Sequence, residues 1–245
     1  MYILYNILIA LACFVSGYLI GAFPTSVVIG KVFFHKDPRD YGSHNPGGTN
    51  AGRLFGKKVG LLIIILDMIK TIAPLWIWWA ILTYSGLKDI QVEGQPLLWD
   101  APLYYYLSAL GTCVGHCWPI YLGFKGGKAV SNFMGIACGS SWVLFIASFL
   151  YFVYLKMKKY VSLTAILIAA THVIVVWTIF IINCFVPATN GFVFWGWGAC
   201  LRLGDQGGWE FPTIMTIMAI ILVIRHSSNI KRLKEGNERK ITWMK

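Results

Sequence analysis

Long apolar runs separated by short polar strings dominate this chain. Five of the runs predict membrane-spanning helices, because each approaches the roughly 20 residues that cross a bilayer. They are residues 3–20 (running on toward residue 30), 59–84, 101–122, 161–186 and the shorter 211–224. A sixth stretch, residues 133–155, fits either one span or two short helices broken at Gly139-Ser140-Ser141.

The basic residues decide between these alternatives. With two short helices, 18 of the 21 lysines and arginines fall on one side, Lys88 and Arg202 fall on the other, and Lys70 lies within a span. A single span would move the basic C-terminal tail to the outer side. Because cytoplasmic loops carry an excess of Lys and Arg, the sequence predicts an all-α polytopic membrane protein. It has seven transmembrane helices including one short pair, its N-terminus outside and its C-terminus cytoplasmic, in a single domain over residues 1–245.

Composition supports an integral membrane protein. The chain is 57% hydrophobic and 13% charged, against about 25% charged in soluble domains. The formal net charge of +11 indicates cytoplasmic loops facing anionic headgroups rather than nucleic acid. Neither Lys nor Arg precedes the first apolar run, which therefore predicts a helix and not a secretory signal. Cys113, His116 and Cys117 could bind a metal, but cysteines in apolar runs are more often small buried residues.

Three short polar strings lie beside the spans, and the charge pattern puts all three on the cytoplasmic side. The first string is residues 42–50, the second is residues 125–128 and the third is residues 226–229. Glycines let backbone N–H groups converge on an anion, while hydroxyls and cations add further donors. Together the strings predict a phosphate-binding site at a membrane surface.

The first string combines glycines with Ser43, Thr49 and the amide of Asn50. Arg53 follows, and we expect it within the first turn or so of the helix that continues into residues 59–84. The planar guanidinium of arginine binds phosphate with two parallel hydrogen bonds. An ordinary glycine turn with solvated polar residues is the plainer interpretation.

The other two strings offer similar groups. Gly126, Gly127 and Lys128 precede a predicted helix, whose N-terminal amides would attract a dianion together with the lysine; the P-loop spacing is absent. His226 and Asn229 are three apart on one helix face at the end of the last span, where a histidine could orient or protonate an oxygen. A basic interfacial loop and a polar helix end are the plainer interpretations.

Asp67 and Lys70 lie inside the second span. An ionisable residue at that depth costs roughly 2.5–3.5 kcal/mol on insertion scales, and the i, i+3 spacing lets the two pair. We interpret them as a structural pair that positions the helix bearing Arg53, with a proton pathway as the alternative.

The strings, in this order and at these spacings, resemble the bacterial acyl-phosphate:glycerol-3-phosphate acyltransferases over nearly the whole chain. The matching segments are DPR at 37–39, GSHNPGGTNAGR at 42–53, GHCWP at 115–119, FKGGK at 124–128, YVSL at 160–163, and His226, Asn229-Ile230, Arg232-Leu233, Gly236, Glu238 and Lys240. The chain departs from the usual family pattern at five of these and nearby positions: His44 and Ala129 replace Gly, Gly48 replaces Ala, Asn132 replaces Thr, and Thr71 replaces Gly.

The resemblance implies an acyl transfer from acyl phosphate to glycerol 3-phosphate, the first acylation step of phospholipid biosynthesis. It implies a multi-pass enzyme of the bacterial cytoplasmic (inner) membrane with its active site on the cytoplasmic face. The implied partners are the two substrates, membrane lipids and the soluble enzyme that makes acyl phosphate. No cofactor, metal, CoA, acyl carrier protein or covalent acyl-enzyme is implied.

The resemblance also assigns residue roles. Residues that would contact the phosphates are Ser43, Thr49, Gly126, Gly127, Lys128 and His226. Arg53, Ser162 and Asn229 would help to hold glycerol 3-phosphate, and Asn50 joins the substrate-binding set. The catalytic set is Ser43, Arg53, Lys128, His226 and Asn229, with His226 and Asn229 orienting groups while a substrate phosphate oxygen takes the proton.

Two other classes of protein compete with this interpretation. A transporter for phosphorylated molecules also uses anion sites, but normally near mid-membrane and with internal repeats. A non-catalytic lipid-binding scaffold is the other. Within acyltransferases, His35 and Asp40 form the H-x-x-x-x-D spacing of enzymes that use acyl-CoA or acyl carrier protein, which we interpret as a chance match.

Overall fold

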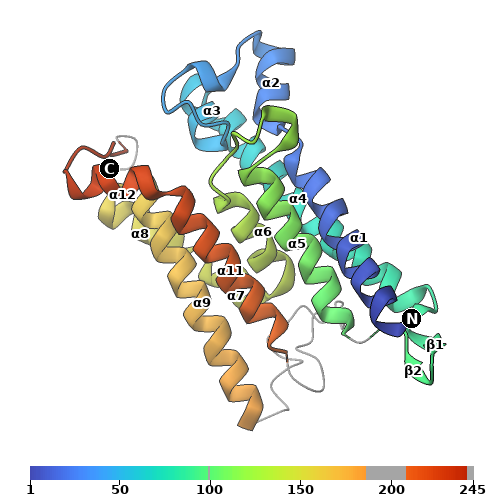
Figure 1. The fold of residues 1–245 in the computed structure, drawn as a ribbon. Helices are drawn as coiled ribbons and strands as arrows, with labels where there is room; N and C mark the ends of the chain where they lie inside the picture. The colour runs from blue at the N-terminus through green and yellow to red at the C-terminus, as the bar shows by residue number, and fades with distance from the viewer. Residues whose placement is uncertain (99, 186–207, 242–245) are drawn as a thin grey trace. The chain divides into compact units, whose positions relative to one another are not determined.

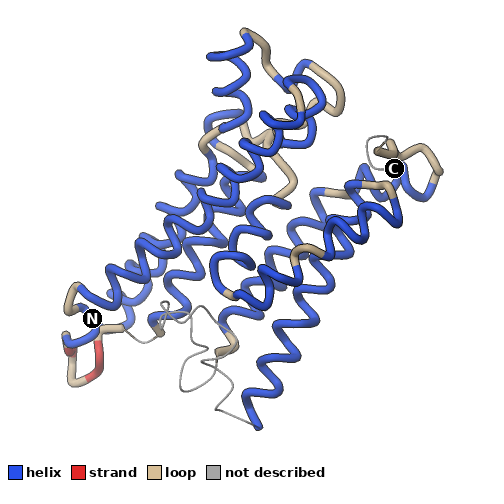
Figure 2. The backbone as a smooth tube through the Cα atoms, turned by 180° about the vertical axis from the view of Figure 1, so that it is seen from behind, coloured by secondary structure: helices blue, strands red, loops and turns tan. Residues whose placement is uncertain are grey.

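The computed structural model describes residues 1–98, 100–185 and 208–241. Helices dominate it, as Figure 2 shows. The chain divides into two compact units, Met1–Gly135 and Ile136–Lys245, and each is described by itself.

The first unit is built on long helices joined by short polar turns (Figure 1). A two-stranded antiparallel hairpin pairs Val92 with Gln95. In chain order its elements are α1 (Tyr2–Ala22), α2 (Thr25–Phe34), η1 (Pro38–Asp40), α3 (Gly48–Phe55), α4 (Lys57–Tyr84), η2 (Leu87–Asp89), β1 (Gln91–Val92), β2 (Gln95–Pro96), α5 (Ala101–Cys117) and η3 (Ile120–Leu122), and α6 (Val130–Ser140) begins in it.

Glycines bring α1 and α5 into backbone contact. A methyl group on Gly17 would lie 2.0 Å from the Ser108 carbonyl oxygen, and one on Gly115 would lie 2.1 Å from the Tyr18 carbonyl oxygen. Gly21 and Gly111 make the same kind of approach, so each helix carries a pair of glycines spaced four apart. Small residues at this spacing let membrane helices pack by close van der Waals contact, which lipid cannot replace.

The two ends of the first unit differ in character (Figure 1). At one end the Met1 amino group lies 3.3 Å from the Glu93 carboxylate in the hairpin turn. At the other end lie α2, α3 and the first two polar strings. The sequence predicts this separation, since it places the N-terminus and residues 85–100 on one side and both strings on the opposite side.

The second unit holds α7 (Trp142–Ala147), α8 (Leu150–Lys158), α9 (Val161–Phe185), α11 (Glu210–Arg225) and α12 (Ser227–Lys234). The predicted break at residues 139–141 is confirmed: α6 ends at Ser140 and the Ser141 hydroxyl caps α7. A second break follows at Ser148, whose hydroxyl donates to the Leu144 carbonyl and lies 3.2 Å from His172 Nε2. This buried histidine of α9 thereby ties the broken segment to a continuous helix.

The described helices are apolar enough for a membrane. Tyr2–Phe34, Lys57–Tyr84 and Val161–Ile182 each pass as a span by length and hydropathy, and α11 with α12, bent by 57°, is a fourth candidate. The seven helices and the orientation of the termini remain predictions. The expected external loop at residues 201–210 lies mostly outside the described residues.

Candidate functional site

The first string is folded around the buried amide of Asn50. Its Nδ2 donates to the carbonyl oxygens of Pro38 (2.7 Å) and Tyr41 (3.0 Å), and its Oδ1 accepts from the Ser43 backbone N–H at 3.0 Å. Asn50 is 3% exposed. The sequence predicts a substrate ligand here, whereas the geometry gives Asn50 the role of shaping the loop that presents Ser43.

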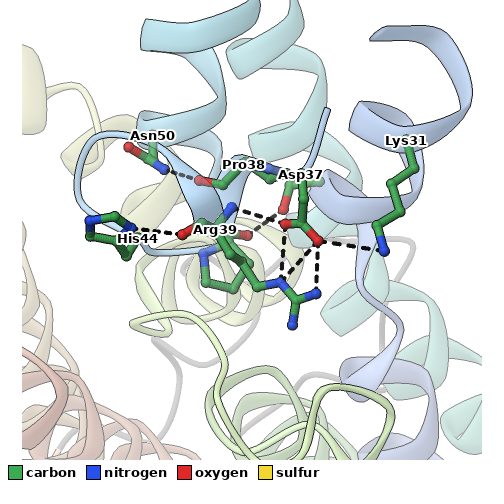
Figure 3. Close-up of polar contacts among 8 residues, drawn as sticks. Lys31, Asp37, Pro38, Arg39, His44 and Asn50 are labelled. Atoms are coloured by element: carbon green, nitrogen blue, oxygen red, sulfur yellow. Dashed lines mark hydrogen bonds and ion pairs between the residues drawn. The ribbon is translucent and has the colours of Figure 1, made fainter. Parts of the chain in front are cut away.

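A charged cluster holds the start of this loop (Figure 3). Asp37 accepts from the backbone N–H of Arg39 (2.9 Å) and from its guanidinium Nη2 (2.7 Å), with Lys31 at 3.6 Å. The hydrogen bonds from the Arg39 side chain hold the pKa of Asp37 below its usual value, against a smaller opposing effect of burial. The cluster commits Arg39 to Asp37 and so fixes the chain just before the string.

The groups expected to bind phosphate are exposed residues in and just after this loop. Ser43, Thr49 and Arg53 are exposed, and the last two are one turn apart on α3. Our expectation that Arg53 lies on the helix continuing to residue 84 is wrong, because Gly56, with φ of 101°, separates α3 from α4. Gly56 adopts this backbone geometry readily because it has no Cβ.

Close packing of α3 on α4 sets the position of Arg53. Gly60 of α4 lies directly against Gly48 and Gly52 of α3. A methyl group on Gly48 would lie 2.6 Å from the Ile64 side chain and 2.9 Å from the Gly60 carbonyl oxygen. The departure from Ala at position 48 therefore has a steric reason in this chain.

The second string uses its glycines for packing. Gly126 N–H donates to the Cys117 carbonyl (3.2 Å) and Gly127 N–H donates to the His116 carbonyl (2.9 Å). A methyl group on Gly127 would lie 2.0 Å from His116 Nε2. We expected these amides to point at an anion, but they already donate to carbonyls within the protein. The glycines are needed because a side chain at either position would prevent the string from lying against the end of α5.

Lys128 follows these glycines and is half-buried, two residues before α6 begins at Val130. Between them Ala129 has φ of 61°, a left-handed conformation that favours glycine. The usual family glycine at this position is thus explained by the turn, and the alanine here retains that turn at some cost in strain.

The first and second strings meet in the first unit. Asn45 Nδ2 lies 3.5 Å from the Gly126 carbonyl oxygen, a long hydrogen bond. Pro46, Gly126 and Gly127 line one small cavity of about 10 Å³ together with Lys70 and Asp67 of α4. Two of the three predicted strings are therefore neighbours in space.

The third string lies in the second unit. His226 sits at the 57° bend between α11 and α12, is 3% exposed, and its Nδ1 is 2.7 Å from the Leu222 carbonyl oxygen. Because a carbonyl only accepts, Nδ1 is the donor in this contact. The bend places His226 and Asn229 on either side of a helix break rather than on one continuous helix face.

Glu238 organises the residues around the third string. Its Oε1 accepts from Ser162 Oγ and from Asn229 Nδ2, both at 2.7 Å, and its Oε2 accepts from Arg232 Nε at 2.8 Å. Burial alone would raise the pKa of Glu238, but the hydrogen bonds from Asn229, Ser162 and Arg232 together lower it. The carboxylate thus stays ionised and holds Ser162 of α9 beside Asn229 of α12.

Glu238 was not among the predicted site residues. The sequence carries one signal for it, because Glu238 is one of the tail positions that match the family pattern. The candidate metal ligands Cys113 and Cys117 are buried, and in the described part of the chain no three His, Cys, Asp or Glu side chains are grouped to bind a metal.

The apolar helices and the paired polar strings define an integral membrane protein. One end of its first unit presents hydroxyls and cations beside the loop that the Asn50 amide shapes. A family model shows which protein class this is. The chain belongs to the glycerol-3-phosphate acyltransferase family, whose model matches residues 11–236, so the predicted family and the predicted membrane acyltransferase are confirmed.

Individual relatives agree with this placement. The chain is 34% identical over 238 residues to glycerol-3-phosphate acyltransferases of Staphylococcus aureus strains JH9 and N315, covering 93% of this chain and 96% of each relative. The fold is similar to crystal structures of PlsY (YgiH), an integral membrane glycerol 3-phosphate acyltransferase. Its glycerol 3-phosphate form gives a TM-score of 0.70 at 24% identity, over 95% of this chain and 96% of that one. Its lysophosphatidic acid form gives 0.69 at 23%, over 95% of each chain.

Proposed function

We propose that this protein transfers an acyl group from acyl phosphate to glycerol 3-phosphate, giving 1-acyl-sn-glycerol 3-phosphate and inorganic phosphate. The observation that carries the proposal is the meeting of the first two strings at Asn45 and Gly126. It brings the exposed Ser43, Thr49 and Arg53 to the same end of the unit as the second string. A reaction between two phosphate-bearing substrates needs such a concentration of donors and cations.

The reaction needs no protein nucleophile. The glycerol hydroxyl oxygen attacks the acyl carbonyl carbon, the bond from that carbon to the phosphate oxygen breaks, and inorganic phosphate leaves. The hydroxyl proton passes to a phosphate oxygen of the substrate. An acyl phosphate is already activated, so the protein contributes by positioning the substrates and by neutralising their charge.

The residues of the first unit suit this task. Ser43, Thr49 and Lys128 would bind phosphate oxygens, and Arg53 would bind glycerol 3-phosphate through its planar guanidinium. Hydrogen bonds to charged groups contribute about 1.5–3 kcal/mol each, so a few of them suffice to hold both substrates. Gly126 and Gly127 would act through the close packing that places Lys128.

The second unit would supply orienting groups. The Ser162 hydroxyl donates a hydrogen bond to Glu238, and its oxygen can still accept one from a glycerol hydroxyl. Asn229 is fixed by the same carboxylate. We assign Ser162 and Asn229 to glycerol 3-phosphate and His226 to orientation of a phosphate.

The reaction would take place at the cytoplasmic face of a bacterial inner membrane. The basic loops fit the cytoplasmic side by the positive-inside rule, and the acyl tail of the donor would stay in the bilayer. A soluble enzyme that makes acyl phosphate is the partner that would supply this donor.

A donor comparison tests the proposal. The purified protein is given glycerol 3-phosphate with acyl phosphate, acyl-CoA or acyl carrier protein, and acylated product and released phosphate are measured. We expect product with acyl phosphate only, and one phosphate released per acyl group transferred. Turnover with acyl-CoA alone would overturn the proposal and would bring His35 and Asp40 back into consideration.

Three variants test the residue roles. Arg53→Ala and Lys128→Ala should each lower kcat/KM about ten- to a hundredfold, the equivalent of one lost charged hydrogen bond. His226→Ala should lower it less, because an orienting group is not an obligatory base. A fall of many decades in kcat with unchanged binding of glycerol 3-phosphate would make His226 the base instead.

A further inference from the structure

A buried ion pair sits where the first long helix breaks. Pro24 cannot continue the helix because it has no backbone N–H, and α1 ends at Ala22 while α2 begins at Thr25. Lys70 Nζ of α4 donates to the Phe23 carbonyl at 2.7 Å and lies 2.8 Å from Asp67 Oδ1. Thr25 Oγ1 donates to the same Asp67 oxygen at 2.9 Å. One turn of α4 therefore binds both sides of the break.

The pair is enclosed within an apolar span. The Asp67 side chain is 3% exposed and the Lys70 side chain is 12% exposed. Charges at such a depth persist only when they are paired and hydrogen-bonded. The Phe23 carbonyl, the Thr25 hydroxyl and the Asp67 carboxylate satisfy this requirement. The geometry of the break and the geometry of the pair therefore depend on each other.

The break leads directly to the first string. Ser26, the second residue of α2, donates its hydroxyl to the Pro46 carbonyl at 2.5 Å. Ser26 is 1% exposed. Thr25, Lys70 and Pro46 also line the same cavity as Gly126. A displacement of the break would therefore be transmitted to the middle of the first string.

The same turn of α4 also holds the helix that follows the second string. Asn132 of α6, four residues after Lys128, donates from Nδ2 to Thr71 Oγ1 at 3.0 Å, and the Asp67 carbonyl lies 3.5 Å away. Asn132 and Thr71 are fully buried. Both strings are thus connected to residues 67–71 of α4, the first through Ser26 and the second through Asn132.

We propose that Asp67 and Lys70 are positioning residues that fix the spacing of the first and second strings and hence of the two substrate phosphates. They touch neither substrate; Lys70 holds the α1–α2 break, and Asp67 holds Lys70 and Thr25. This inference rests on the proposed function, in which both strings bind phosphate. It replaces the expectation that the pair positions the helix bearing Arg53.

The test removes the pair without leaving a buried charge. Asp67→Asn with Lys70→Met deletes both charges and the bond to Phe23, and replacing a whole buried ion pair often leaves stability unchanged. Ser26→Ala cuts only the link to Pro46. Ser16→Ala is the matched control, because Ser16 accepts from Trp78 at 2.8 Å and joins the same two helices, α1 and α4, away from the break.

Three measurements are made on protein purified in detergent: the thermal midpoint Tm, the calorimetric Kd for glycerol 3-phosphate, and KM and kcat with acyl phosphate. We expect the double variant and Ser26→Ala to raise Kd and KM about tenfold, a part of the roughly hundredfold that a misplacement by a full ångström can cost. Ser16→Ala should leave Kd and KM unchanged. If the pair only stabilises the fold, the variants should contain less active enzyme and therefore show a lower apparent kcat. Their Kd and KM should then equal those of the native chain.

Native Kd and KM in the double variant, with its Tm preserved, would overturn the inference. A rise in KM that Ser16→Ala shares would do the same, because it would indicate general loosening of α1 against α4. If the native chain binds glycerol 3-phosphate but does not react with acyl phosphate, the proposed function fails, and the Kd values still decide the role of the pair.

Discussion

Asn50→Ala separates the residue that shapes the first string from the residues that would bind substrate. The change deletes three hydrogen bonds, to the carbonyls of Pro38 and Tyr41 and from the Ser43 N–H. At about 1 kcal/mol each, their loss destabilises the loop by about 3 kcal/mol. If the loop must be ordered for turnover, kcat/KM should fall by about two orders of magnitude.

The assay that distinguishes shaping from binding needs no substrate. Trypsin can cleave after Lys36 and Arg39 only when the surrounding loop opens, and the rate of such cleavage follows the population of the open form. Asn50→Ala should be cleaved there much faster than the native protein. Ser43→Ala is the matched control, because it removes a proposed ligand hydroxyl but keeps the N–H that Asn50 accepts.

We therefore expect Ser43→Ala to lose activity while trypsin cleaves it at the native rate. Asn50→Ala should lose both its activity and its protection from trypsin. The reasoning is refuted if Asn50→Ala keeps native protection from trypsin and only raises KM for glycerol 3-phosphate. That result would make Asn50 a substrate ligand, as the sequence alone suggests.

Three further predictions concern stability. The lowered pKa of Glu238 means that its charge stabilises the folded protein above the unfolded carboxyl pKa, and that this contribution is lost as pH falls through the folded value; Glu238→Gln should reduce the acid-side fall in Tm, and an unchanged fall contradicts this. His44 has φ of 55° and its Nδ1 donates to the Arg39 carbonyl, a bond that both variants lose, so trypsin should cleave the loop faster in His44→Val than in His44→Gly, by the equivalent of about 1–2 kcal/mol of strain. Gly115→Ala should lower Tm or the yield of folded protein, because its methyl group would lie 2.1 Å from the Tyr18 carbonyl; a native Tm would show that α1 and α5 can separate.

Periodicity and length predict most helices of this fold, because apolar runs of membrane length have few alternative structures. The starts of α4, α5 and α9 agree with the predicted runs to within two residues. The break at residues 139–141 was also predictable, since a Gly-Ser-Ser triplet interrupts an apolar run. The break at Pro24 carries an equally plain signal, yet the predicted first span runs on through it toward residue 30.

The pairing of helices is not contained in any one segment. Gly17 and Gly21 show the small-residue spacing of a membrane interface, as do Gly111 and Gly115. Nothing local says that these two pairs face each other. The packing of His116 on Gly127 joins residues that are closer in sequence, but no residue pattern announces it. In this packing the two amides expected to bind an anion donate instead to carbonyls within the protein.

The candidate site, like the fold, is only partly predictable from the sequence. Residue type identifies polar groups at the membrane surface but does not separate a ligand from a residue that holds a ligand. Asn50 has the chemistry of either, and only its three hydrogen bonds to the backbone assign it to the loop. Glu238 matches the family pattern but has the wrong charge for a phosphate ligand, and only the structure shows that it holds Ser162 and Asn229 together.

The departures from the family pattern fall on residues that shape the candidate site, and none of them replaces a proposed ligand. His44 and Ala129 occupy left-handed positions that suit glycine, and His44 Nδ1 also donates to the Arg39 carbonyl at 2.8 Å. The other two substitutions to larger or more polar side chains, Thr71 and Asn132, hydrogen-bond to each other. Two changes that meet in one buried bond preserve the connection between α4 and α6, so the strings can keep their spacing while the residues that set it change.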